Sequence, residues 1–195
     1  MKSVLISIKP KWCELIASGK KTVEVRKTKP KIDTPFKGYI YCTYGEGLIE
    51  ANDEVLPNHL IGVKVSKNKI WGNCCNGKVI GEFICDEIIN TIDIGCNDFY
   101  TKSCMSLGEW LEYTDNHKGE MWCWHISDLV IYDKPKELSE FYTRCYSGCD
   151  NCQYQSWDYA LGGGKDLICT VSNKKPIKRP PQSWCYVELL KGGAE

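Results

Sequence analysis

The stretch Gly19-Lys20-Lys21-Thr22-Val23-Glu24-Val25-Arg26 decides the fold, because it joins a helix to a strand with no intervening loop. Gly19 suits the left-handed turn that ends a helix. From Thr22 onward polar and apolar residues alternate, which is typical of a half-buried strand. The two valines are expected to face inward, while Glu24 and Arg26 project together from the other face.

The residues before this stretch supply a first strand and a short helix. Residues 4–8 read VLISI, a short β-branched run that predicts a strand. Pro10 suits the first turn of a helix, where its missing N–H costs nothing. Trp12, Leu15 and Ile16 then form one apolar stripe at helical spacing. The predicted order is strand, proline-started helix, glycine turn and strand.

The rest of the chain predicts more strands and a second helix. Ser106 and Glu109 have the spacing of a capping box, which starts a helix. Residues 44–77 contain many Gly and Asn and are expected to form a long loop with at most one strand. We therefore predict an α+β, mainly β fold: a small β-barrel with two or three short helices and a Cys-rich C-terminal excursion. Its later strands are expected at 39–43, 78–85, 124–132 and 183–189, with a helical turn at 136–142.

The Cys-rich excursion spans residues 143–181. We expect three parts: a barrel over 1–142, this insert over 143–181, and a final strand with a tail over 182–195. Three cysteines lie close together in the insert and a fourth follows later, which makes them a candidate Zn²⁺ site; free thiols are the alternative. The candidate ligands are Cys145, Cys149, Cys152 and Cys169.

The 13 cysteines of the chain also bear on its compartment. The first ten residues show no secretory signal, so reduced cytosolic thiols are expected rather than a disulfide framework. No run of eighteen apolar residues occurs, and no membrane span is expected. Several cysteines lie inside apolar runs, where they behave as small core residues.

The charge of the chain is zero overall but uneven along its length. Residues 1–40 hold ten basic and three acidic residues, so this segment carries +7 and the remainder −7. Such asymmetry directs an anionic partner to one face of a protein. A solvated lysine-rich surface is the alternative explanation.

The form GxKxxExR at residues 19–26 follows Ser7-Ile8-Lys9-Pro10 and a short helix. In this order the chain resembles the ASCH family, the PUA-related barrels, over residues 1–142 as an arrangement. The segments GKVIGEF at 77–83, WHISDLVIYD at 124–133 and RPPQSWCYVE at 179–188 are similar to those of phage-type ASCH proteins. The resemblance implies a phage or bacterial source, and a cytoplasmic location.

The motif predicts a cleft in which Lys21, Glu24 and Arg26 converge and remain open to solvent. Arginine offers a planar fork for phosphate or a base edge, and lysine a compact charge. Glu24 can accept from an exocyclic amine or serve as a base; an ordinary ion pair with Arg26 is the alternative. Aromatic rings nearby suit unstacked bases. The expected nucleic-acid-binding residues are Lys9, Lys20, Lys21, Glu24, Arg26, Lys27, Trp124 and His125.

The resemblance implies RNA, a nucleotide or a modified nucleoside as the ligand, and it implies two family activities. Some ASCH proteins are ribonucleases, for which a divalent metal would be expected; others are amidohydrolases that deacetylate N4-acetylcytidine. A hydrolase of either kind would use Lys21 and Glu24 as catalytic residues. The amidohydrolases use a Lys, a Thr and a Glu. Lys21 matches the Lys, Glu24 occupies the Thr position, and Asp98 is the only acid in 95–105, where the family's Glu lies.

A third hypothesis comes from another functional class. The chain would be a phage interaction protein whose Cys-rich insert docks a host protein. RNA binding, RNA cleavage and host-protein binding therefore stand as the three hypotheses that the sequence raises.

Overall fold

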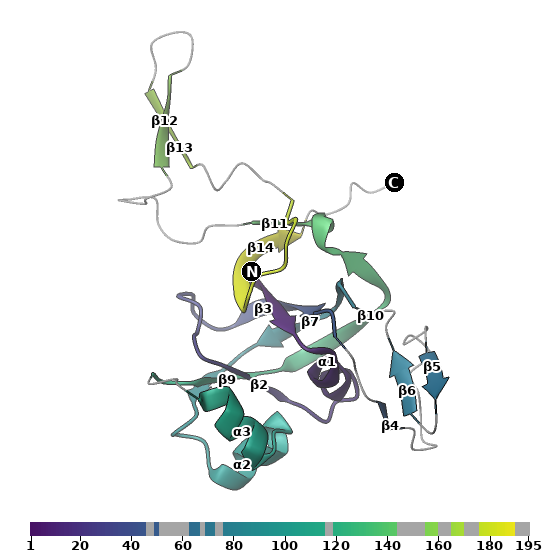
Figure 1. Ribbon diagram of the computed structural model, residues 1–195. Coiled ribbons are helices and arrows are strands. Elements are labelled where there is room, and N and C mark those ends of the chain that lie inside the picture. The colour runs from purple at the N-terminus through teal and green to yellow at the C-terminus, as the bar shows by residue number, and fades with distance from the viewer. Residues whose placement is uncertain are drawn as a thin grey trace.

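The computed structural model describes residues 1–45, 49–50, 63–66, 69–72, 76–115, 119–143, 155–159, 165–169 and 176–189. Strands predominate in this part of the chain, and the α+β, mainly β class predicted from the sequence is confirmed. Figure 1 shows α2 and α3 together at the lower margin of the molecule, whereas α1 lies near its middle, below β3 and β7.

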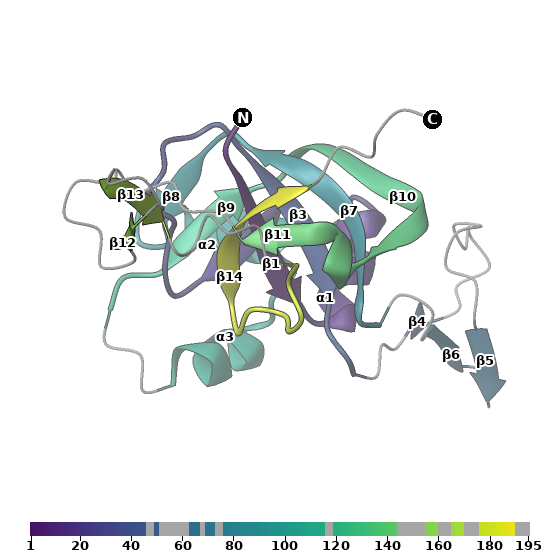
Figure 2. The same cartoon turned by 90° about the horizontal axis from the view of Figure 1, so that it is seen from above.

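A six-stranded mixed sheet forms the main layer. Strand β1 lies at its centre, parallel to β3 and antiparallel to β14. Figure 2 shows β1 between these two neighbours. The last strand in the chain therefore returns to the middle of the sheet. In spatial order the strands are β10 (Ser127–Glu137), β7 (Lys78–Cys85), β3 (Phe36–Cys42), β1 (Ser3–Ile8), β14 (Trp184–Leu189) and β11 (Phe141–Thr143).

A second, three-stranded sheet packs against the first. It consists of β2 (Val23–Arg26), β9 (Trp122–His125) and β8 (Ile88–Asn90), with β9 in the middle. The described strands do not join into one closed ring: the two sheets enclose a common core instead. Residues 124–132, predicted as one strand, are divided between β9 and β10 at Ile126, because the chain leaves one sheet and enters the other there.

Three α-helices accompany these sheets in the described residues. They are α1 (Pro10–Ala17), α2 (Cys96–Ser103) and α3 (Leu107–Thr114). The predicted helical turn at 136–142 is a 3₁₀ turn at Leu138–Glu140, between the ends of β10 and β11. Within residues 44–77, where a long loop with at most one strand was expected, the described residues form three short strands: β4 (Ile49–Glu50), β5 (Val63–Ser66) and β6 (Lys69–Gly72). Two further short strands are β12 (Gln155–Tyr159) and β13 (Lys165–Cys169).

The core lies on both faces of the main sheet. Val4, Ile6 and Ile8 of β1 face the core shared with the second sheet, whereas Leu5 faces a separate cluster on the far side. A strand buried on both faces reads as a continuous apolar run, which explains the VLISI sequence. Gly38 is required in β3, because a Cβ there would lie 2.3 Å from the Phe83 ring.

A third cluster covers the outer face of the second sheet. Val23 and Val25 of β2 pack there against Phe99 of α2 and beneath Trp110 of α3. Figure 1 shows both helices on that side of β2 and β9. Strand β2 is consequently buried along its whole length, not on one face alone.

None of the helices in the described residues is long and apolar enough to cross a membrane.

Candidate nucleic-acid interface

The turn before β2 sets the position of Lys21. Gly19 has φ +72°, which a left-handed turn requires, and its N–H bonds to the carbonyl of Ile16. The N–H of Lys21 then bonds to Leu15. These backbone bonds fasten the start of β2 to the end of α1, so the lysine side chain leaves the turn in a fixed direction.

Glu24 and Arg26 project from one face of β2, as the alternation predicts. In the register with β9, Glu24 lies opposite Trp124 and Arg26 opposite Trp122. Residues directly opposite each other in an antiparallel pair share a face. The face with Glu24 and Arg26 is therefore the one that looks toward the main sheet.

The three charged residues of the motif meet through Glu24. One guanidinium nitrogen of Arg26 lies 2.9 Å from Glu24 Oε1, and Lys21 Nζ lies 3.5 Å from Glu24 Oε2. The same arginine donates to the Ser7 carbonyl at 2.6 Å, and the lysine to the Ser103 carbonyl at 2.7 Å. We call Lys21, Glu24 and Arg26 the motif cluster. It ties β2 to β1 and to the end of α2.

The motif cluster is buried, which differs from the solvent-open cleft that the sequence predicts. Lys21, Glu24 and Arg26 are 2%, 6% and 8% exposed. The ring of Trp12 lies 4.9 Å from Lys21 Nζ, in cation–π geometry. The packing of α1, α2 and the main sheet around β2 accounts for the burial, because a strand pattern reveals which face a residue occupies but not what covers that face.

The motif cluster holds more positive than negative charge. It contains two cations and one carboxylate, and among residues with described side chains no second carboxylate lies within ion-pair distance of either cation. Arg26 Nε and Trp124 Nε1 are buried donors without a hydrogen-bond partner in the described part of the chain. Buried donors are normally satisfied. These two lie on one face as diagonal neighbours, enclosed within the protein.

Two titratable neighbours remain protonated beside the motif cluster. Burial raises the pKa of the Cys123 thiol to about 11; Lys21 opposes this rise and Glu24 adds to it. Burial also raises the pKa of Tyr113, against the effect of Arg26. Neither group supplies a negative charge near neutral pH, so the surplus positive charge is not compensated by them.

The remaining lysines proposed from the sequence lie at the surface around the motif cluster. Lys9 and Lys20 are exposed, at the two ends of α1, and Lys27 is half-buried directly after β2. Lys27 Nζ lies 5.1 Å from the centre of the Tyr113 ring. Because Arg26 bonds to Ser7, the ends of β1 and β2 adjoin, so each of these lysines lies within two residues of a group that forms or binds the motif cluster.

Trp124 and His125 do not have the positions expected of them. Trp124 is 0% exposed and packs edge-on against Phe36 at 5.6 Å, so it is a core residue and cannot stack on a base. His125 projects from the opposite face of β9 and pairs with Asp86 at 2.7 Å. Burial would raise the pKa of Asp86, but the hydrogen bond with His125 outweighs it and lowers that pKa.

The sequence analysis did not name Lys29 or Trp184 as binding residues of this surface. Lys29 Nζ lies 3.6 Å from the centre of the Trp122 ring. The Trp184 indole donates to Thr28 at 3.0 Å, which links β14 to the loop after β2. The lysine run from 27 to 31 was visible in the sequence, but its aromatic partners lie more than eighty residues away, and only the fold brings them together.

The structure describes Asp98, the acid considered for catalysis, but not most of the cysteines proposed to bind metal. Cys145, Cys149 and Cys152 lie outside the described residues, and Cys169 is described only as the end of β13. Zinc therefore stays a prediction. Asp98 pairs with Lys102 at 3.2 Å on the exposed side of α2. It is not brought to Lys21, whose nitrogen is held by Ser103 and Glu24.

Comparison with known proteins places this site in a family context. Residues 6–83 match the family model of the ASCH domain. The crystal structure of the ASCH protein of Zymomonas mobilis is similar at 15% identity over 96% of this chain and 88% of that chain, with a TM-score of 0.48. A single-residue variant of that protein matches at 18% identity over 71% of this chain and 77% of that chain, with a TM-score of 0.46. No curated protein matches the sequence. The chain therefore carries an ASCH domain over residues 6–83.

Proposed function

We propose that this chain binds single-stranded RNA on the lysine-rich surface that surrounds the motif cluster. An ASCH domain implies a PUA-like fold of the RNA-binding kind. The observation that carries the proposal for this chain is the surplus positive charge of the motif cluster, with exposed Lys9 and Lys20 and half-buried Lys27 around it.

The chemistry of this surface favours a polyanion. Lysine side chains neutralise phosphates and release counterions, which supplies sequence-independent affinity. Beneath them, the surplus positive charge of the motif cluster adds to the attraction that these lysines exert on a polyanion.

A single strand is favoured over a duplex because aromatic rings lie among the lysines. Trp122 and Trp184 are partly exposed, unlike Trp124. Unstacked bases pack on such rings, whereas a duplex keeps its bases stacked inside. The surface therefore offers both contacts that single-strand binders use.

Binding is better supported than hydrolysis. Catalysis by Lys21 would require a free amine, yet its nitrogen contacts Ser103, Glu24 and the Trp12 ring. Glu24 is likewise shared between two cations. Such groups hold a structure firmly and make poor nucleophiles or bases, so the ribonuclease and amidohydrolase hypotheses become outcomes of the test.

The test measures the anisotropy of a labelled single-stranded RNA at increasing protein concentration, with and without Mn²⁺. We expect binding without cleavage. The log–log slope of affinity against salt should fall by about 0.7 when Lys27→Glu removes one phosphate contact. Lys134→Glu is the matched control, because Lys134 is exposed on β10. RNA cleavage that Lys21→Ala abolishes would support the enzyme instead, and absence of binding would refute the proposal.

A further inference from the structure

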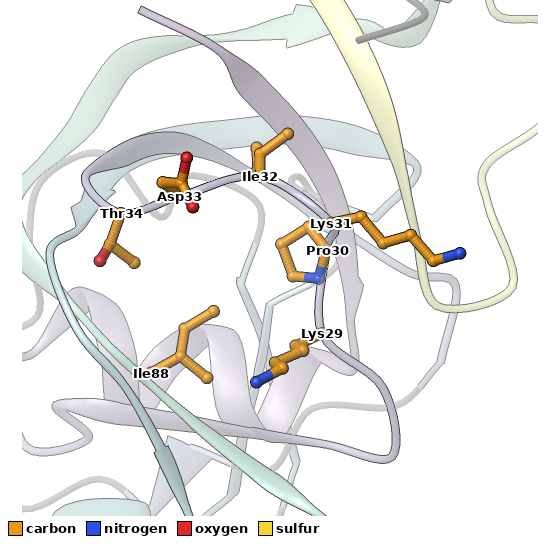
Figure 3. Close-up of a pocket in the computed structure, with 7 residues that line it drawn as sticks. All are labelled: Lys29, Pro30, Lys31, Ile32, Asp33, Thr34 and Ile88. Atoms are coloured by element: carbon orange, nitrogen blue, oxygen red, sulfur yellow. The ribbon is translucent and has the colours of Figure 1, made fainter. Parts of the chain in front are cut away.

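A shallow pocket lies beside the lysine-rich surface, in the loop that joins β2 to β3. Its volume is about 300 Å³, and it is lined by residues 29–34 and by Ile88 of β8. Figure 3 shows Lys29 directing its amine toward Ile88 across the opening, with Asp33 and Thr34 on the far side and Lys31 pointing away. One cation, one carboxylate and one hydroxyl thus lie around the opening, with Ile88 on its other side.

The loop around this pocket is held in place at several points. Thr28 accepts the bond from the Trp184 indole, and the N–H of Lys31 donates to the Tyr186 hydroxyl at 2.8 Å. Lys29 rests on the Trp122 ring. The loop is therefore fastened to β14 and β9, and the pocket exists before any ligand arrives, which lowers the entropy that binding must overcome.

The negative charge of Asp33 would not be expected on a surface whose one role is to attract phosphate. It is exposed, and it has no ion pair or hydrogen bond to its carboxylate among the described residues. A carboxylate in the same loop as Lys29 and Lys31 repels a polyanion and so weakens general affinity. It becomes favourable only if the ligand donates a hydrogen bond to it, since bonds to a charged acceptor are the stronger ones.

We infer that this pocket takes one ribonucleotide of the bound strand, with Lys29 on its phosphate and Asp33 accepting the ribose 2′-hydroxyl. The 2′-hydroxyl is the group that distinguishes RNA from DNA, and deoxyribose offers no donor at that position. The pocket volume is at the lower end for small-ligand sites, which fits a single nucleotide. This inference rests on the proposed RNA binding and adds its preference for RNA over DNA.

The test compares oligouridine with oligodeoxyuridine of equal length, which differ only in the 2′-hydroxyl. The wild-type chain should bind the RNA about tenfold more tightly, the scale of one bond to a charged acceptor. Asp33→Ala should abolish this preference by weakening RNA binding, and it should leave DNA binding unchanged or tighter. Asp33→Asn keeps an acceptor oxygen and should retain part of the preference.

The controls separate recognition from simple charge. If Asp33→Ala tightens RNA and DNA equally, the carboxylate only repels phosphate and the inference is overturned. Asp133→Ala, on exposed β10, should leave the RNA-to-DNA ratio unchanged. Lys29→Ala should weaken both ligands alike, because both carry phosphate. Equal binding of RNA and DNA by the wild type overturns this inference alone, whereas binding of neither also overturns the proposed function.

Discussion

At the scale of single residues, the motif cluster combines two roles in one group of atoms. Glu24 forms ion pairs with both Lys21 and Arg26, and each cation also donates a hydrogen bond to a backbone carbonyl of a distant segment. Such a buried network holds elements in register, and its cost is the desolvation of three charges. The surplus cation is what links this structural role to the binding of an anionic ligand.

Glu24→Gln tests the structural role. The change leaves two buried cations without a carboxylate, and removing one partner of a buried ion pair destabilises a protein by about 3–5 kcal/mol. We expect a loss of this size in the free energy of unfolding, measured with urea. Glu112→Gln, on the exposed side of α3, should change stability by less than about 0.5 kcal/mol. Equal effects of the two substitutions would show that the motif cluster does not hold the fold together.

Removing the charge of Glu14 on α1 should stabilise the protein above neutral pH, whereas removing that of Glu24 should destabilise it. Burial raises the pKa of its carboxyl from 4.5 to about 7. A raised carboxyl pKa means that the folded state holds its proton more tightly, so the stability from this group is present below pH 4.5 and lost as pH rises through about 7. Glu14→Gln should therefore have a higher melting temperature than the wild type at pH 8 and a similar one at pH 4. A constant difference across this range would contradict the burial of the carboxyl.

The sequence predicted the convergence of Glu24 and Arg26 but not their burial. The two-residue period of a strand fixes which side chains share a face. What covers that face depends on α1, α2 and the main sheet, and α2 was not foreseen. Its sequence CNDFYTKS has few apolar positions, and Phe99 and Ser103 are its buried residues, so no helical stripe marks it.

At the scale of elements, the sequence predicted correctly those features that nearby side chains form by their own hydrogen bonds. The capping box of α3 is confirmed: Ser106 accepts from the N–H of Glu109, whose carboxylate accepts from the N–H of Ser106. Lys11 of α1 pairs with the same carboxylate. By contrast, the bend at Ile126 between β9 and β10 has no proline or glycine to mark it, and the sequence suggested one strand.

The capping box also predicts a pH dependence. Burial would raise the pKa of Glu109, but the hydrogen bonds from Lys11 and Ser106 outweigh it and lower that pKa to about 2. A lowered pKa gives stability that is present above the ordinary value of 4.5 and lost as pH falls toward 2. The wild type should therefore lose more stability than Glu109→Gln between pH 5 and pH 2, followed by thermal unfolding. Parallel curves would contradict the paired state of this carboxylate.

At the scale of the whole molecule, the order of the chain explains how distant segments build one surface. Strand β14 comes after the Cys-rich segment and still pairs with β1, which brings Trp184 beside the loop after β2. The basic N-terminal segment, residues 1–40, thus lies beside an aromatic ring from the other end of the chain. Composition could show the charge asymmetry, but only the topology of the sheet could show its partners.

Mapping where RNA touches the protein tests the central claim most directly. A single-stranded RNA containing 4-thiouridine would be cross-linked to the full chain by light, and the attached peptides identified by mass spectrometry. We predict cross-links within residues 9–34 and at Trp122 or Trp184, around the motif cluster. Cross-links confined to β10 or to the far face of the main sheet, or none at all, would contradict the account.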